Sequence, residues 1–196
     1  PLRLEHGKCW KIHHSQEARF YCKSSLFFVR VKLKYVNKES MAWAKQMEHY
    51  KALKHPNIPK FHFYEEFNIS NTEYDAMIVE SAEGGHSGDF LLSPEGVHAR
   101  EKQGIGFCCL FQAAVSYGIA SALDYLHERG IVHCDVRLGN VVMKQSLPDC
   151  ISSPQLCQAM LTDYDSSCHF DTRGCKDFAT IRGSRYYLSP EILEEA

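Results

Sequence analysis

The chain has 196 residues, of which 44% are hydrophobic and 23% are charged, and its formal net charge at pH 7 is −2. This length and apolar fraction suffice for one folded core or two small lobes. A charge so close to zero does not indicate the strongly basic balance of proteins that bind nucleic acid or anionic membranes, so we expect no partner of either kind.

The N-terminal residues and the cysteines bear on the cellular compartment. Pro1 to Glu5 do not form a signal peptide, and we expect no apolar run to reach the ~18 residues that a membrane span needs. Nine cysteines, an odd number without a Cys-x-x-Cys pair, argue against a disulfide framework. We therefore predict a cytoplasmic protein whose cysteines are reduced thiols.

The N-terminal part of the sequence predicts strands and one helix. Phe27 to Lys34 alternates apolar and polar side chains, which is the period of a half-buried strand. Asn37 to Lys54 has helical spacing and ends at His55-Pro56-Asn57, because the residue before a proline resists the helical conformation. Two further strands are expected around Lys60–Phe67 and Tyr74–Glu80.

The remainder of the sequence predicts helices around a polar loop. Ser93 to Gly106 is expected to be a polar connection that contains proline and glycine. Phe107 to Arg129 has the strongest helical pattern in the chain, and Gly130 follows it where a left-handed residue commonly ends a helix. Ile131-Val132 and Val141–Met143 are short apolar pieces with the character of strands.

Between these two apolar pieces lies the polar octapeptide His133-Cys-Asp-Val-Arg-Leu-Gly-Asn140. It brings a carboxylate (Asp135), a cation (Arg137) and a carboxamide (Asn140) into one loop. Phosphoryl transfer needs such groups to orient the acceptor hydroxyl, to meet the transferring negative charge and to hold a metal ion. A polar turn without chemistry is the alternative for the octapeptide taken alone.

The sequence around this loop resembles the protein kinase family. Ala120 to His133 resembles, almost residue for residue, the helix and strand before the catalytic loop, and the loop is similar to the family's His-Arg-Asp-x-x-x-x-Asn. Asp163-Tyr164-Asp165 resembles the magnesium-binding Asp-Phe-Gly. Gly183-Ser184 and Ser189-Pro190-Glu191 resemble the end of the activation segment. All of these stretches follow one another in the family's order.

The resemblance implies a two-lobe α+β fold. A small antiparallel β-rich N-lobe (residues 1–80) is expected to lead through a hinge (81–86) into a mainly helical C-lobe (87–196) that is incomplete after the activation segment. ATP and Mg²⁺ are the implied cofactors, and serine or threonine hydroxyls of protein substrates are the implied acceptors.

The resemblance also implies roles for the residues of the loop. Asp135 would be the catalytic base and Arg137 would contact the γ-phosphate, as the family's lysine does. Asn140 and Asp163 would bind magnesium.

The implied ATP-binding residues lie in the N-terminal half. Gly7 resembles the third glycine of the family's phosphate-binding loop, although leucines occupy the positions of the other two. Val79 would be the gatekeeper, and the backbone of Glu80 and of Ala82 would hold the adenine.

Several positions depart from the family's pattern. Lys32 and Lys34 both fit the ATP-binding lysine of the third strand, and Lys32 leaves the more usual length before the next helix. The position of its glutamate partner holds Gln46, with Glu48 two residues later, and Cys134 replaces the arginine that receives a phosphorylated activation loop. These departures leave open a second hypothesis, a pseudokinase or kinase-like interaction module without catalysis.

Overall fold

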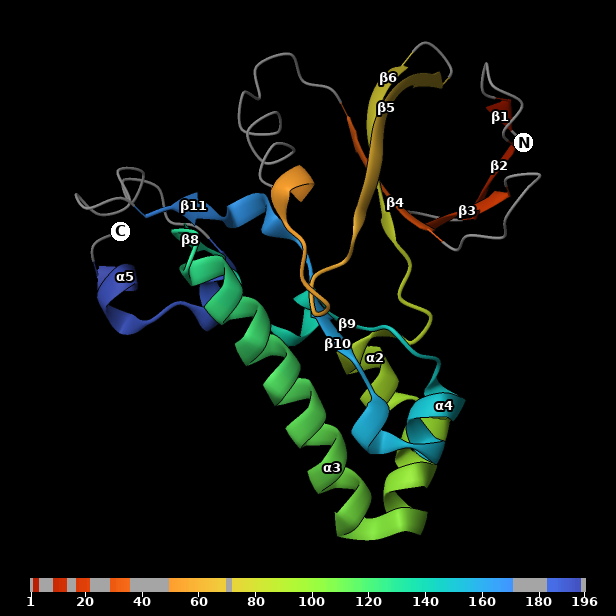
Figure 1. The fold of residues 1–196 in the computed structure, drawn as a ribbon, viewed down its shortest axis with the longest axis vertical. Coiled ribbons are helices and arrows are strands. Elements are labelled where there is room, and N and C mark those ends of the chain that lie inside the picture. The colour runs from red at the N-terminus through yellow and green to blue at the C-terminus, as the bar shows by residue number, and fades with distance from the viewer. Residues whose placement is uncertain are drawn as a thin grey trace. The chain divides into compact units, whose positions relative to one another are not determined.

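The computed structural model describes residues 2–3, 9–13, 17–21, 29–35, 50–69, 72–170 and 183–194. The chain divides into two units (Figure 1). The first unit comprises residues 1–54 and 59–82, and the second comprises residues 55–58 and 83–196. The chain therefore passes from one unit to the other three times.

In the described part of the first unit there are two antiparallel sheets, each with three strands. The strand order is β1-β2-β3 in the first sheet and β4-β6-β5 in the second. The six strands are β1 (Leu2–Arg3), β2 (Cys9–His13), β3 (Glu17–Tyr21), β4 (Val29–Tyr35), β5 (Phe61–Ile69) and β6 (Thr72–Glu80). The strands predicted at Lys60–Phe67 and Tyr74–Glu80 are confirmed as β5 and β6. β4 confirms the strand predicted at Phe27–Lys34 over residues 29–34, and Phe27 and Phe28 lie outside the described residues.

The helix predicted at Asn37–Lys54 is described only at its end. Residues 50–52 are helical, and the backbone N–H of Leu53 donates to the carbonyl of Tyr50 at 3.2 Å. Both of these side chains are buried. The rest of the predicted helix lies outside the described residues. The chain then turns at Pro56, as the sequence predicts.

The second unit combines helices with short strands. Its strands form a three-stranded sheet in the order β10-β9-β7 and a pair of β11 with β8. The strands are β7 (Gly85–His86), β8 (Ile131–Val132), β9 (Val141–Met143), β10 (Ala159–Leu161) and β11 (Cys168–His169). The helices are α2 (Ser87–Leu92), α3 (Pro94–His127), α4 (Leu147–Ser152) and α5 (Pro190–Glu194). Single 3₁₀ turns cover Leu138–Asn140, Pro154–Leu156, Tyr164–Ser166 and Arg185–Tyr187.

The polar connection predicted at Ser93–Gly106 is wrong, because this segment is helical. The Ser93 hydroxyl accepts a hydrogen bond from the Gly96 N–H at 3.0 Å and so caps the helix, and Pro94 occupies a first-turn position that needs no N–H donor. Gly104, at φ 66° and ψ −153°, interrupts the helical backbone. α3 is therefore two helices joined at Gly104, and the second confirms the prediction at Phe107–Arg129.

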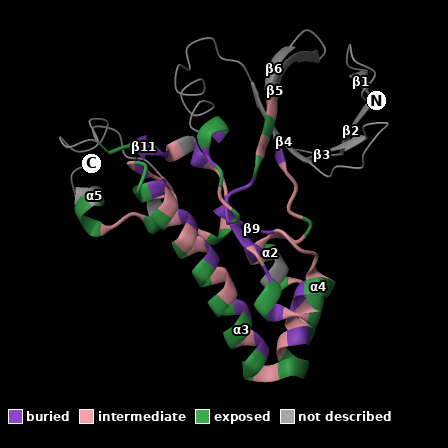
Figure 2. Ribbon diagram, viewed as in Figure 1, coloured by how far each residue is buried: buried purple, intermediate pink, exposed green. Residues whose placement is uncertain are grey.

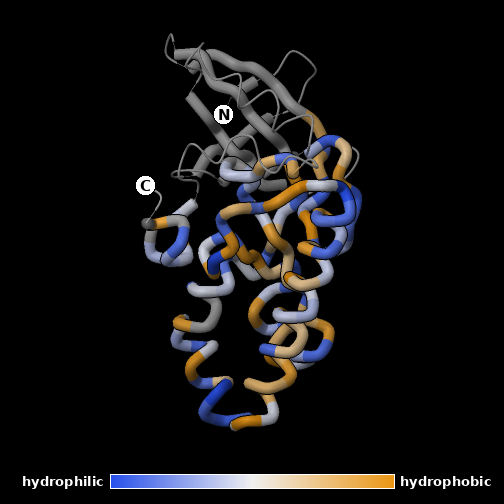
Figure 3. Tube along the Cα trace, turned by 90° about the vertical axis from the view of Figure 1, so that its left-hand side faces the viewer, coloured by the Kyte–Doolittle hydropathy of each residue, from blue (hydrophilic) through white to orange (hydrophobic). Residues whose placement is uncertain are grey.

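The expectation that no apolar run reaches the length of a membrane span is also wrong. Residues 104–123 contain no charged side chain, and α3 is long and apolar enough to cross a bilayer by length and composition alone. A helix at the core of a folded unit passes the same test. α3 packs against α4, β8 and β10, and Figure 3 shows hydrophobic and hydrophilic residues interspersed along the helices of this unit. Of this apolar stretch 22% is buried, and Ile105, Leu110 and Tyr117 are among its exposed side chains, so α3 packs along only part of its surface.

The core of the second unit lies where α3 meets β9 and β10, both of which are buried throughout (Figure 2). The turn at residues 55–58 closes this core. The Asn57 side-chain amide donates to the carbonyl of Ala159 at 2.7 Å, and its backbone carbonyl accepts from the Leu161 N–H at 2.8 Å. A Cβ at Gly118 of α3 would lie 2.7 Å from the same amide nitrogen, so the helix needs glycine at this point of close approach.

The segment between β9 and β10 contains a disulfide. Cys150 of α4 and Cys157 are joined, with their Cα atoms 5.3 Å apart, and Cys168 is disulfide-bonded as well. The Gln145 side chain accepts from the Gln158 N–H at 2.7 Å and brings the two ends of the segment together. The prediction of reduced thiols is wrong here, because the fold of α4 and the following 3₁₀ turn brings together two cysteines whose spacing alone indicates no pair.

Candidate active site

The octapeptide predicted to carry the chemistry follows β8 and leads into β9. Cys134 has a left-handed backbone (φ 63°), which turns the chain out of β8, and the 3₁₀ turn Leu138–Asn140 returns it to the sheet. The His133 ring is almost fully buried. Its Nδ1 accepts from the Asp135 N–H at 3.2 Å, so the ring proton is on Nε2, which faces the carbonyl of Thr162 at 3.1 Å. A neutral histidine therefore joins the loop to the strand end after β10.

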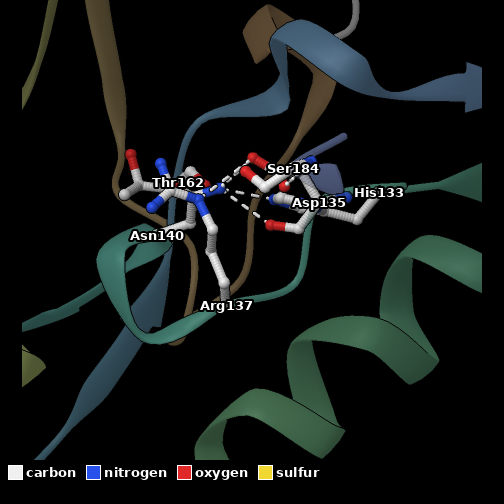
Figure 4. Close-up of polar contacts among 6 residues, drawn as sticks. All are labelled: His133, Asp135, Arg137, Asn140, Thr162 and Ser184. Carbon is white, nitrogen blue, oxygen red and sulfur yellow. Dashed lines mark hydrogen bonds and ion pairs between the residues drawn. The ribbon is translucent and has the colours of Figure 1, made fainter. Parts of the chain in front are cut away.

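The Asp135 carboxylate is the centre of the hydrogen bonds drawn in Figure 4. Its Oδ2 accepts from Asn140 Nδ2 at 2.8 Å and from Arg137 Nε at 3.3 Å. Its Oδ1 accepts from the backbone N–H of Ser184 at 2.8 Å. Asn140 Nδ2 also donates to the Asp135 carbonyl at 2.7 Å. The structure thus brings together three of the predicted site residues, Asp135, Arg137 and Asn140.

These contacts lower the pKa of the Asp135 carboxyl. Burial by itself raises the pKa of its carboxyl, but hydrogen bonds from Ser184, Asn140 and Arg137 outweigh burial and hold the pKa below its ordinary value. Asp135 is therefore an ionised hydrogen-bond acceptor at neutral pH.

The stability that Asp135 contributes is expected to vanish in acid. A carboxyl whose pKa is lower in the folded state stabilises the fold above its unfolded pKa of about 3.9 and loses that effect as the pH falls through the folded pKa. The melting temperature of Asp135→Asn should therefore lie below that of the unaltered protein at about pH 7 and approach it below about pH 4. Calorimetric scans across this range check the prediction, and a gap that stays constant on acidification would contradict it.

The second predicted carboxylate, Asp163, follows β10 and is fixed by its neighbours. The backbone N–H of Thr162 donates to the Asn140 carbonyl at 2.9 Å, and Asp163 itself has a left-handed backbone (φ 68°, ψ 70°). Tyr164 is 2% exposed, its hydroxyl donates to the Leu161 carbonyl at 3.0 Å, and its ring lies 4.9 Å from that of His133. The segment after β10 is thus tied to the octapeptide at two points.

The oxygen atoms of Asn140 and Asp163 suit magnesium, which prefers hard oxygen ligands and binds through one or two protein groups together with phosphate and water. The amide nitrogen of Asn140 is occupied by Asp135, so its carbonyl oxygen is the atom left for a metal ion. Within the described ranges there is no cluster of three or more His, Cys, Asp and Glu side chains that would form an all-protein metal site. The donor set therefore fits a metal ion shared with a phosphate ligand.

Gly183 and Cys134 show how the C-terminal segment reaches the loop. Gly183 has φ 93°, and a Cβ there would overlap the carbonyl oxygen of Cys134, so only glycine permits this approach. The Cys134 sulfur lies 3.5 Å from the sulfur of Cys168 in β11. The resemblance predicts that Gly183-Ser184 belongs to the end of the activation segment, but it gives no sign of the close approach of Gly183 to Cys134 or of the contact between the two sulfur atoms.

The predicted ATP-binding residues belong to the first unit. Val79 is buried in β6, and the Glu80 N–H donates to the carbonyl of Lys60 at 2.8 Å. Ala82 ends that unit, and the backbone of Lys32 pairs with Met77 across β4 and β6. The other residues predicted near ATP lie outside the described residues: Gly7, Gln46 and Glu48.

Comparison with known proteins agrees with this geometry. The model of the protein kinase domain family matches residues 6–196. Similar proteins include the serine/threonine-protein kinase RUNKEL of Arabidopsis thaliana (24% identical over 98% of this chain), polo of Drosophila melanogaster (27%, 95%) and sgk-1 of Caenorhabditis elegans (25%, 95%). The chain spans 12%, 28% and 35% of the lengths of these three proteins. The expected α+β fold is confirmed, and the chain belongs to the protein kinase family.

Proposed function

We propose that the protein transfers the γ-phosphate of ATP to serine or threonine hydroxyls of protein substrates. The observation that carries this proposal is the ionised Asp135 carboxylate, which the loop and the C-terminal segment hold through Arg137, Asn140 and Ser184. A loop with a purely structural role does not require a carboxylate, a guanidinium and a carboxamide to converge in this way. The relatives with similar sequences are named as serine/threonine kinases, which supports the choice of acceptor.

In this proposal each residue of the loop has one task. Asp135 accepts a hydrogen bond from the substrate hydroxyl and takes its proton as the oxygen attacks phosphorus. The Arg137 side chain is 35% exposed, and its guanidinium carries further donors besides Nε, which meet the negative charge of the transferring phosphoryl group. Bound Mg²⁺ would supply charge neutralisation on the phosphate oxygens, and Asn140 and Asp163 would hold it.

Nucleotide binding by these residues is tested by a thermal melt of the full-length protein with ATP, with and without Mg²⁺. Ligand at about 100 times its Kd stabilises the folded state by roughly 2.7 kcal/mol, so a clear rise in melting temperature is expected only when Mg²⁺ is present. The rise should be lost in Asp163→Ala. It should persist in Asp124→Ala, which removes an exposed carboxylate from α3 of the same unit.

A cooperative melt that ATP and Mg²⁺ leave unmoved would count against catalysis. That outcome would favour the alternative, a kinase-like interaction module.

A further inference from the structure

Gly139 lies beside the Arg137 side chain in the turn Leu138–Asn140. A Cβ added at residue 139 would lie 2.6 Å from Nη1 of Arg137, 3.2 Å from Cζ and 3.6 Å from Nη2. The first distance is shorter than any ordinary contact of a Cβ atom. The guanidinium thus occupies the space that a side chain at residue 139 would fill.

In this position the Nε donor and the two Nη donors of the guanidinium have different surroundings. Nε donates to Asp135 Oδ2 at 3.3 Å, so one edge is held by the carboxylate. Neither Nη atom has a hydrogen bond to another residue in the part of the chain that the structure describes. The Nη donors therefore remain available for an anionic group beside Asp135.

A side chain at residue 139 would displace the guanidinium without unfolding the loop. Arg137 is long and 35% exposed, so it can swing toward solvent at small cost to stability. Residue 139 has no left-handed backbone, so alanine fits its main chain without strain. The substitution would therefore break the hydrogen bond between Arg137 and Asp135. A lysine at residue 137 lacks the planar guanidinium and would not occupy the space beside residue 139.

We infer that Gly139 is a positioning residue: because it lacks a side chain, the Arg137 guanidinium can lie against Asp135, and the arginine and the glycine form a coupled pair. The inference rests on the proposed function for its effect on catalysis, since Arg137 meets the phosphoryl group only in that scheme. Its structural content, the position of the guanidinium, does not depend on activity.

The kinetic test is a double-mutant cycle of Gly139→Ala and Arg137→Lys, measured as phosphate transfer to a protein substrate. Gly139→Ala is expected to lower kcat about tenfold, since one hydrogen bond between charged groups is lost, and to lower the melting temperature only slightly, since Arg137 can turn to solvent. In the Arg137→Lys background, adding Gly139→Ala should cause no further loss. Gly106→Ala is the matched control, because a Cβ there meets nothing within 4 Å. Equal losses from Gly139→Ala in both backgrounds would overturn the inference.

The second readout needs no activity. In a ¹⁵N NMR spectrum the Arg137 Nε–H signal, assigned by its loss in Arg137→Lys, should be protected from exchange with water by Asp135. Gly139→Ala should abolish this protection and Gly106→Ala should keep it. If the unaltered protein transfers no phosphate, the proposed function fails while this spectrum still tests the inference. Protection that survives Gly139→Ala would overturn it.

Discussion

Asp135→Asn is expected to lower kcat for phosphate transfer by about 10³-fold, within the range of 10² to 10⁴ that a positioned general base contributes. The asparagine keeps the size of the side chain but cannot take the proton of the substrate hydroxyl. It also offers an NH₂ group where the structure supplies donors on both sides, from Ser184 to one oxygen and from Arg137 and Asn140 to the other. Whichever way the amide lies, one donor faces another, so the melting temperature at neutral pH should fall as well.

Radiolabelled phosphate transfer and a calorimetric melt of the same preparation check both parts of this expectation. Asp124→Asn on the exposed face of α3 makes the same chemical change away from the loop and should alter neither quantity. A variant at residue 135 that retained more than about a tenth of kcat would rule out a general base in that position.

Gly183→Ala is the second substitution with a large expected effect. The added Cβ would overlap the Cys134 carbonyl oxygen and would lie 3.5 Å from Asp135 Oδ1, and a backbone atom cannot swing aside as a side chain can. The segment would therefore move away and break the bond from the Ser184 N–H to the carboxylate. A displacement of about 1 Å at reacting groups costs on the order of 10² in rate, and we expect a loss of that size in kcat.

Gly104→Ala separates steric overlap from backbone strain in this experiment. Gly104 also has a left-handed φ, but a Cβ there meets nothing within 4 Å. Alanine at residue 104 should cost roughly 1–3 kcal/mol of stability, because the φ and ψ of Gly104 lie in a region that favours glycine, and it should leave kcat unchanged. Equal kinetic effects of the two substitutions would show that the overlap with Cys134 has no role in catalysis.

The sequence predicts those parts of the molecule that depend on local patterns. The alternation after Phe27 and the helical spacing from Phe107 are properties of short segments, and both elements form where these patterns predict. The octapeptide around Asp135 concentrates its polar groups within one turn, so its neighbours in sequence are also its neighbours in space. Ser184, 49 residues farther along the chain, donates its backbone N–H to the same carboxylate, and no pattern within the octapeptide indicates this contact.

The failures have physical causes that a pattern does not contain. Ser93 and Pro94 were interpreted as parts of a connection, although the same residue types also begin helices, and here they cap α3. Cys150 and Cys157 pair because α4 folds the chain back, which their spacing does not show. The need for glycine at residue 139 depends on where a guanidinium lies, and such a position is known only from coordinates.

The turn at residues 55–58 sets the order in which the chain can complete its second unit during synthesis. Asn57 is made 102 residues before Ala159, the partner of its side chain, and Asp163 follows the strand that begins at Ala159. At about 5–20 residues per second, the ribosome takes roughly 5–20 s to cover that interval. The sequence of the first unit is complete once residue 82 has been made, whereas the turn still lacks Ala159 and Leu161. The segment that bears the second carboxylate therefore takes its final place late in translation and requires a turn made long before it.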